Sequence, residues 1–124
     1  MNNQNIDDFF NGRRTHNRFE SAADISLKIV FSSENPGLLG RMINGAALDV
    51  SANGLRISLN QAVKLDSVLD IWITDKELNR KYFLTGNVRW CLESGKPGDF
   101  QIGLILRERS DTVTDLRSWR EAFK

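Results

Sequence analysis

The chain has 124 residues, of which 40% are hydrophobic and 27% are charged, values that suit one soluble domain with a single core. Its 17 lysine and arginine residues against 16 aspartate and glutamate residues give a net charge of +1, which argues against a general nucleic-acid binder, so any anion site must be local. A single cysteine, Cys91, and a single histidine, His16, exclude an internal disulfide and a structural metal site of the cysteine type, and they disfavour catalytic or metal sites built on several histidines.

The N-terminal residues 1–12 are rich in asparagine and aspartate and have no hydrophobic period, so we expect a flexible tail there. A basic, polar segment follows at 13–20. In the stretch Ile25–Phe31 every second residue is a large apolar one, which is the period of a half-buried strand.

Further strand-like stretches follow at short intervals, at 42–50, 55–59, 68–74, 81–90 and 100–106. Between two of them, Asn53-Gly54 predicts a tight hairpin turn, because both residue types tolerate positive φ. Short, evenly spaced strands favour a closed or nearly closed antiparallel barrel, since closure removes exposed edges.

The end of the chain changes to a helical period. Val113, Leu116, Trp119 and Phe123 fall on one face of a helix expected over 111–123, with Ser110 or Thr112 as its N-cap. The predicted fold class is therefore mainly β (all-β): a six-stranded antiparallel β-barrel over about 21–107, flanked or plugged by a C-terminal α-helix and preceded by a flexible N-terminal segment.

Three arginines gather ahead of the first strand. Arg14 and Arg18 make an R-x-x-x-R motif, and Arg13 precedes it. The planar guanidinium group donates paired hydrogen bonds to a phosphate, and the same fork matches the O6 and N7 acceptors of guanine. The alternative is a solvated basic stretch without a ligand.

The second motif is D-x-S-x-x-G, formed by Asp49, Ser51 and Gly54. The Asp49 carboxylate can accept hydrogen bonds from a guanine Watson–Crick edge or hold an arginine in place, and the Ser51 hydroxyl can contact a phosphate or base. Gly54 permits positive φ and a close approach of a ligand to the backbone. The alternative is a plain hairpin in which Asp49 and Ser51 make turn hydrogen bonds and Asn53-Gly54 forms the turn.

Together and in this order, the two motifs resemble a PilZ domain, a bacterial receptor module for the second messenger cyclic di-GMP. The resemblance covers about residues 13–110, so we expect a PilZ domain over 13–124. It implies that Arg14 and Arg18 hold phosphate and guanine, that Asp49 and Ser51 hold the other guanine edge, and that Gly54 shapes the turn.

The resemblance also bears on stoichiometry and on flanking residues. An arginine at the position of Arg13 accompanies binding of two stacked, intercalated ligand molecules, which we expect here. Trp90 lies late in a strand, where some relatives place an aromatic residue close to the ligand; its alternative is barrel or helix packing. Asn53 is a second flanking candidate, or a purely structural turn residue. For Trp72 and Trp119 we expect packing in the core or against the helix.

The function implied is that of a receptor and not an enzyme, without a resident cofactor or metal. Cyclic di-GMP would change the conformation of the N-terminal segment and signal to an effector protein in trans, in the control of motility, biofilm or exopolysaccharide. The alternatives are a PilZ-like protein-interaction module that does not bind the nucleotide and, less in keeping with the charge, a small nucleic-acid-binding barrel. The resemblance allows a monomer or a homodimer.

Location follows from what the sequence lacks. No run approaches the roughly 18 apolar residues of a membrane span, and residues 1–8 have neither the basic nor the apolar region of a signal peptide. We therefore expect a cytoplasmic, bacterial protein without membrane insertion.

Overall fold

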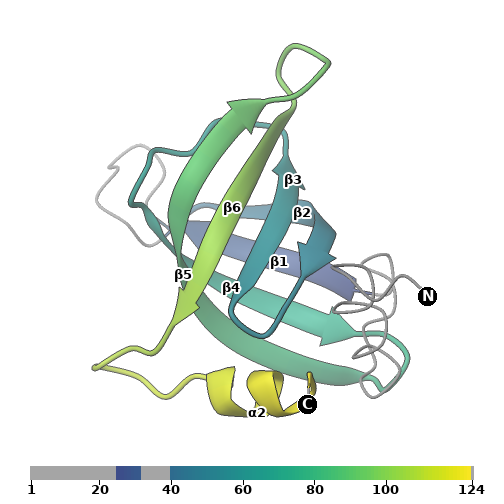
Figure 1. The fold of residues 1–124 in the computed structure, drawn as a ribbon, viewed down its shortest axis with the longest axis vertical. Helices are drawn as coiled ribbons and strands as arrows, with labels where there is room; N and C mark the ends of the chain where they lie inside the picture. Colours follow the sequence, from purple (N-terminus) through teal and green to yellow (C-terminus); the bar gives the residue numbers. More distant parts are fainter. Residues whose placement is uncertain (1–24, 32–39, 124) are drawn as a thin grey trace, which may run out of the picture.

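A computed structural model of the chain describes residues 25–31 and 40–123. These residues form six β-strands and one short helix (Figure 1). The elements are β1 Ile25–Phe31, β2 Met42–Val50, β3 Gly54–Leu59, β4 Val68–Asp75, β5 Arg80–Glu93, β6 Phe100–Arg107 and α2 Leu116–Glu121. No helix within the described residues is long and apolar enough to cross a membrane.

The six strands close into a barrel in the order β1-β2-β3-β6-β5-β4, with β1 pairing to β4 to complete the ring. Each neighbouring pair is antiparallel. Each of these six strands thus has two hydrogen-bonded neighbours, which confirms the predicted six-stranded antiparallel barrel and avoids the unpaired edges that invite aggregation.

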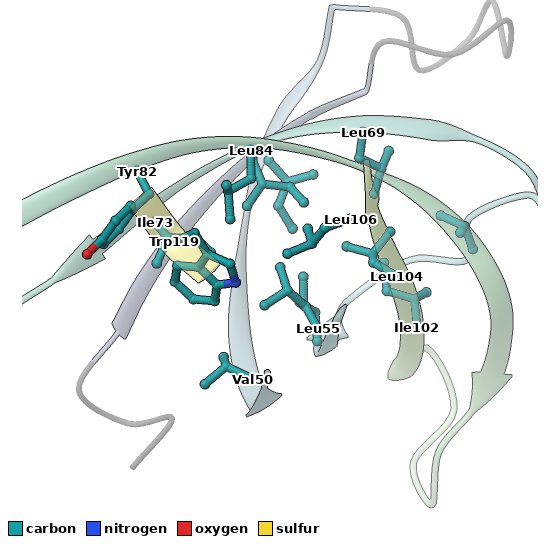
Figure 2. Close-up of a cluster of buried hydrophobic side chains, with 14 of the residues drawn as sticks. Val50, Leu55, Leu69, Ile73, Tyr82, Leu84, Ile102, Leu104, Leu106 and Trp119 are labelled. Atoms are coloured by element: carbon teal, nitrogen blue, oxygen red, sulfur yellow. The ribbon is translucent and has the colours of Figure 1, made fainter. Parts of the chain in front are cut away.

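The core fills the inside of the barrel because the strands alternate in burial. In β4, Leu69, Ile71 and Ile73 point inward and are fully buried, while the residues between them lie outside. The helix α2 lies across one end of the barrel (Figure 1) and inserts Trp119 among the core side chains (Figure 2). Trp119 is fully buried and meets the Tyr82 ring edge-on, with ring centroids 5.3 Å apart.

The helix is shorter than the sequence pattern predicted. It begins at Leu116, and Val113 lies outside it with 93% of its surface exposed. Neither Ser110 nor Thr112 caps it: the N-cap is Asp115, whose side chain makes no capping hydrogen bond. Instead, the Asp115 carboxylate accepts a hydrogen bond from the Phe83 N–H at 2.7 Å, and the Asp115 N–H donates to the Phe83 carbonyl at 2.8 Å. These two hydrogen bonds fix Asp115 to β5, so the helix begins only after residue 115.

An ion-pair cluster fixes the route from β6 to α2. The Arg109 guanidinium binds Asp70 on β4 at 2.9 Å and Asp111 in its own segment at 2.9 Å. The hydrogen bond from Arg109 lowers the pKa of Asp111 below its ordinary value, and the same bond, with the charge of Asp70, raises the pKa of Arg109. The connecting segment is thereby held against β4, and α2 starts from a defined position.

Candidate functional site

Four residues on four neighbouring strands lie side by side on the outer face of the barrel. Asp49 on β2 pairs with Arg56 on β3, Arg56 pairs with Gly103 on β6, and Gly103 pairs with Trp90 on β5. All four line a groove of about 450 Å³, together with Arg89, Ser51, Gly54 and four apolar residues. The row therefore places a carboxylate, a guanidinium and an indole in one depression.

Two irregularities in the strands shape this groove. The register shifts between Ala47 and Asp49 in β2 and between Val88 and Trp90 in β5. At each shift two consecutive residues are exposed, Leu48 with Asp49 and Arg89 with Trp90. Bulges of this kind bend a strand and redirect side chains, and they are common beside functional sites. Here the bulge in β5 leaves both Arg89 and Trp90 on the outside.

Trp90 is held over a glycine. A Cβ atom on residue 103 would overlap the Trp90 indole. The indole can therefore lie against the β6 backbone only because residue 103 is a glycine. Trp90 remains 36% exposed and Gly103 is buried beneath it. Trp90 therefore packs on the outer surface and not in the barrel core, and part of its ring is available for a planar ligand to stack on.

Arg56 links the two halves of the row. Its guanidinium lies 3.6 Å from the Asp49 carboxylate, and the two side chains are 43% and 56% exposed. A second contact joins Arg56 to the Gln101 side chain at 3.4 Å. Asp49 thus holds an arginine, one of the two roles the sequence suggested for it, and both groups stay accessible to solvent.

Ser51 stabilises the turn between β2 and β3. Its hydroxyl accepts a hydrogen bond from the Gly54 N–H at 3.1 Å and donates one to the Gly54 carbonyl at 3.2 Å. The Ser51 carbonyl accepts a further hydrogen bond from the Trp119 indole N–H at 2.9 Å. The turn hydrogen bonds expected of a plain hairpin are therefore present at Ser51, and the same residue fastens the hairpin to α2.

The predicted conformation of the Asn53-Gly54 turn is wrong. Among the described residues, positive φ occurs at Gly40, Asp66, Asn79 and Gly98. Gly54 instead begins β3, where a Cβ atom would come within 2.8 Å of the Leu104 carbonyl oxygen on β6. Glycine at position 54 therefore allows two backbones to approach closely, and the turn itself is formed by residues 51–53.

The hydrogen bonds of Asn53 within the described part of the chain join the hairpin to other elements of the fold. Its side-chain oxygen accepts a hydrogen bond from Arg120 on α2 at 3.0 Å, and its carbonyl accepts one from the Leu106 N–H at 2.9 Å. It is not among the residues that line the groove. The tip of the hairpin is thus bound to both α2 and β6.

The three N-terminal arginines and the two remaining tryptophans were also predicted from the sequence. Arg13, Arg14 and Arg18 lie outside the described residues, so their place at the groove stays a prediction. Trp119 is buried as expected, but Trp72 is 38% exposed on the outer face of β4, so its assignment to the core is wrong. Outward orientation follows from its position in the strand, because the flanking Ile71 and Ile73 occupy the inward face.

Sequence reasoning missed Arg56, Arg89 and Gly103 as groove residues. Arg56 carried a weak signal, since a charged residue between Leu55 and Ile57 in a strand must face outward. No local signal marks Gly103, because its role depends on Trp90 of another strand. Within the described part of the chain, no group of three or more histidine, cysteine or acidic residues is arranged to hold a metal ion.

Comparison with known proteins places the chain in a family. The sequence matches the PilZ domain family over residues 12–119, and the chain belongs to that family of cyclic di-GMP receptor modules. A solved structure, the Bacillus subtilis inhibitor of motility MotI/DgrA, superposes with a TM-score of 0.57 at 16% identity and covers 83% of this chain. The chain spans 46% of the length of that protein. A comparison with curated proteins gives no match.

Proposed function

We propose that this protein binds cyclic di-GMP in the groove between Asp49 and Trp90 and passes the signal to a partner protein. The observation that carries the proposal is the row Asp49, Arg56, Gly103 and Trp90. It combines a carboxylate that can accept hydrogen bonds from guanine, a guanidinium cation and an aromatic ring on which a base can stack. Asp49 and Arg56 of this row lie on the β2–β3 hairpin, which carries the D-x-S-x-x-G motif of the family. The function that we propose is that of a receptor and not that of an enzyme.

The charged and aromatic side chains of the groove suit different parts of the ligand. A guanine stacked on Trp90 would gain about 1–3 kcal/mol. The Asp49 carboxylate would accept from the guanine N1–H and N2–H₂ groups, after release from an exposed ion pair with Arg56 that contributes about 0–1 kcal/mol. Arg56 and Arg89 would then face the phosphates, beside Arg14 and Arg18 from the segment ahead of β1.

The signal would leave through the N-terminal segment. Phosphates that neutralise Arg13, Arg14 and Arg18 would draw residues 13–18 onto the groove. Ordering a residue costs about 1–2 kcal/mol, which charge-assisted hydrogen bonds of about 1.5–3 kcal/mol each can offset. The altered surface would be recognised by an effector protein in trans, as in the control of motility, biofilm or exopolysaccharide.

Hydrogen exchange tests this relay. On addition of cyclic di-GMP, the backbone amides of residues 5–18 are expected to exchange more slowly, because the segment becomes ordered on the barrel. Mass spectrometry of peptides from the labelled protein gives the measurement, with cyclic AMP as the nucleotide control. Equal exchange rates with and without bound cyclic di-GMP would remove the N-terminal segment from the mechanism.

Calorimetric titration tests the proposed function itself. We expect submicromolar to low-micromolar binding of cyclic di-GMP, at about −7 kcal/mol or more favourable, and no comparable binding of GTP or cyclic AMP. Two nucleotides per chain would match the intercalated pair expected from Arg13, and one would contradict that pair. The absence of binding up to about 100 μM, or about −5.5 kcal/mol, would favour the alternative, a PilZ-like module that binds proteins without the nucleotide.

Gly103→Ala is expected to weaken cyclic di-GMP binding about five- to a hundredfold, because the new methyl group displaces the Trp90 indole that the ligand stacks on. Trp90→Ala should have a similar effect, and the double variant should be no worse than Trp90→Ala alone. Calorimetry gives the affinities. Gly95→Ala is the matched control, because nothing lies within 4 Å of a Cβ there. Wild-type affinity in Gly103→Ala would exclude Trp90 as a stacking surface.

A further inference from the structure

A second hollow lies on the opposite side of the barrel from the groove. The groove is centred on β3 and β6, whereas this hollow is formed by β2, β1, β4 and β5, and β1 and β4 lie behind β3 and β6 in Figure 1. Its volume is about 270 Å³. The residues that line it are Lys28, Met42, Trp72, Thr74 and Lys81, called the lysine–tryptophan hollow below.

Register explains why these side chains meet. Trp72 on β4 pairs with Lys28 on β1 and, on its other side, with Phe83 on β5. The Trp72 and Phe83 rings stack in a tilted arrangement, with centroids 4.8 Å apart. Lys81 pairs with Thr74, one row away from Trp72 on the same face. The tryptophan is therefore fixed by Phe83 and has one lysine on each neighbouring strand.

The composition of the hollow differs from that of an ordinary surface. Trp72 is 38% exposed and Met42 is 59% exposed, so two large apolar side chains face solvent together. Single exposed apolar residues are normal, but tryptophan and methionine in a concavity are typical of the centre of protein interfaces. Both charged residues that line the hollow are lysines, so its rim is cationic in a chain that is nearly neutral overall.

We propose that the lysine–tryptophan hollow is the docking site for an acidic segment of a partner protein. An aromatic or aliphatic side chain of that segment would enter the hollow against Trp72, and flanking carboxylates would pair with Lys28 and Lys81. Charge complementarity of this kind selects the partner and speeds association. The inference rests on the proposed function only in taking the receptor to act on a partner protein: the hollow would hold that partner, and the nucleotide-dependent surface at the groove would be a second contact with it. Because the hollow is on the far side from the groove, nucleotide and partner can be bound together.

Two synthetic peptides test the charge complementarity. Each has about 15 residues with the same leucine anchors at helical spacing; one carries glutamates between them and the other carries lysines. Fluorescence anisotropy of the labelled peptides, with the full-length protein, gives the affinities. The acidic peptide is expected to bind at least about tenfold more tightly than the basic one. In the double variant Lys28→Glu with Lys81→Glu, this preference should reverse, and Trp72→Ala should weaken both peptides.

The control variant carries the same charge change elsewhere. Lys96→Glu with Arg117→Glu alters two exposed residues that do not line the hollow, and it should keep the wild-type preference. Equal preference shifts in both double variants would show a general charge effect and overturn the proposal. Phe9 and Phe10 are the two aromatic residues of the N-terminal segment 1–12. A tenfold gain in acidic-peptide affinity after Phe9→Ser with Phe10→Ser would assign the hollow to that segment and would overturn the proposal as well.

The same variants separate this inference from the proposed function. Lys28→Glu with Lys81→Glu should bind cyclic di-GMP as the wild type does. If nucleotide binding is intact but the two peptides bind alike, the docking site is wrong and the receptor function stands. If the peptides behave as expected and cyclic di-GMP does not bind, the hollow is the site of a protein-interaction module.

Discussion

Replacing both Arg14 and Arg18 by alanine is expected to weaken cyclic di-GMP binding about a hundred- to ten-thousandfold. Each guanidinium would make charge-assisted hydrogen bonds to phosphate or guanine, and each such bond contributes about 1.5–3 kcal/mol. Each single variant should therefore lose about ten- to a hundredfold or more. Calorimetric titration gives the affinities, and circular dichroism verifies that the barrel is intact.

The matched control removes two cations that lie away from the groove. Lys96→Ala with Arg117→Ala has the same change in net charge, and both residues are exposed and do not line the groove. Its affinity should stay near that of the wild type, since long-range attraction between exposed charges is largely screened by salt. Wild-type affinity in the Arg14 and Arg18 variants would mean that the R-x-x-x-R motif is a solvated basic stretch.

Trp119→Ala is expected to lower the free energy of unfolding by about 3–5 kcal/mol, the range for removing a large aromatic side chain from a core. Trp119 is fully buried (Figure 2), meets Tyr82 and Phe123, and is one of the two side chains that α2 buries in the core, with Leu116. Urea unfolding followed by circular dichroism measures the change. Val113→Ala serves as the control: Val113 is 93% exposed, and its loss should change stability by less than about 0.5 kcal/mol.

Trp119→Phe separates packing from the hydrogen bond. Phenylalanine keeps most of the buried ring but cannot donate to the Ser51 carbonyl, so we expect a smaller loss of about 1–2 kcal/mol. Because that bond anchors the turn after Asp49, cyclic di-GMP affinity should also fall. If Trp119→Phe loses stability but keeps full affinity, α2 supports the fold and does not position the site.

The strands were predictable because their signals are local. Strand β1 was predicted at 25–31 and occurs there, since alternation of apolar residues and the flanking polar segments are properties of the stretch itself. The end of β5 was not predictable in the same way. It extends to Glu93 because Cys91, Leu92 and Glu93 pair with β6, and that pairing depends on a distant segment.

Three errors have physical reasons that the structure makes visible: two come from contacts between distant segments, and one comes from the alternation of side chains within a strand. Asp115 favours hydrogen bonds with Phe83 over an earlier helix start. Gly54 is required by the approach of β6 and not by a positive φ. Trp72 faces outward because Ile71 and Ile73 take the inward positions of β4. For Asp115 and Gly54 the reason lies in a strand from another part of the chain, whereas for Trp72 it lies in the adjacent residues of its own strand.

The sequence by itself determined the strand pattern and the two motifs, and through them the family to which the chain belongs. Only the tertiary structure decided that Arg56, Gly103 and Trp90 stand in one row with Asp49, and that Trp72 meets Lys28 on the opposite face. The physical reason is register: a shift of one residue would turn each of these side chains to the other face, and pairing between distant strands sets it.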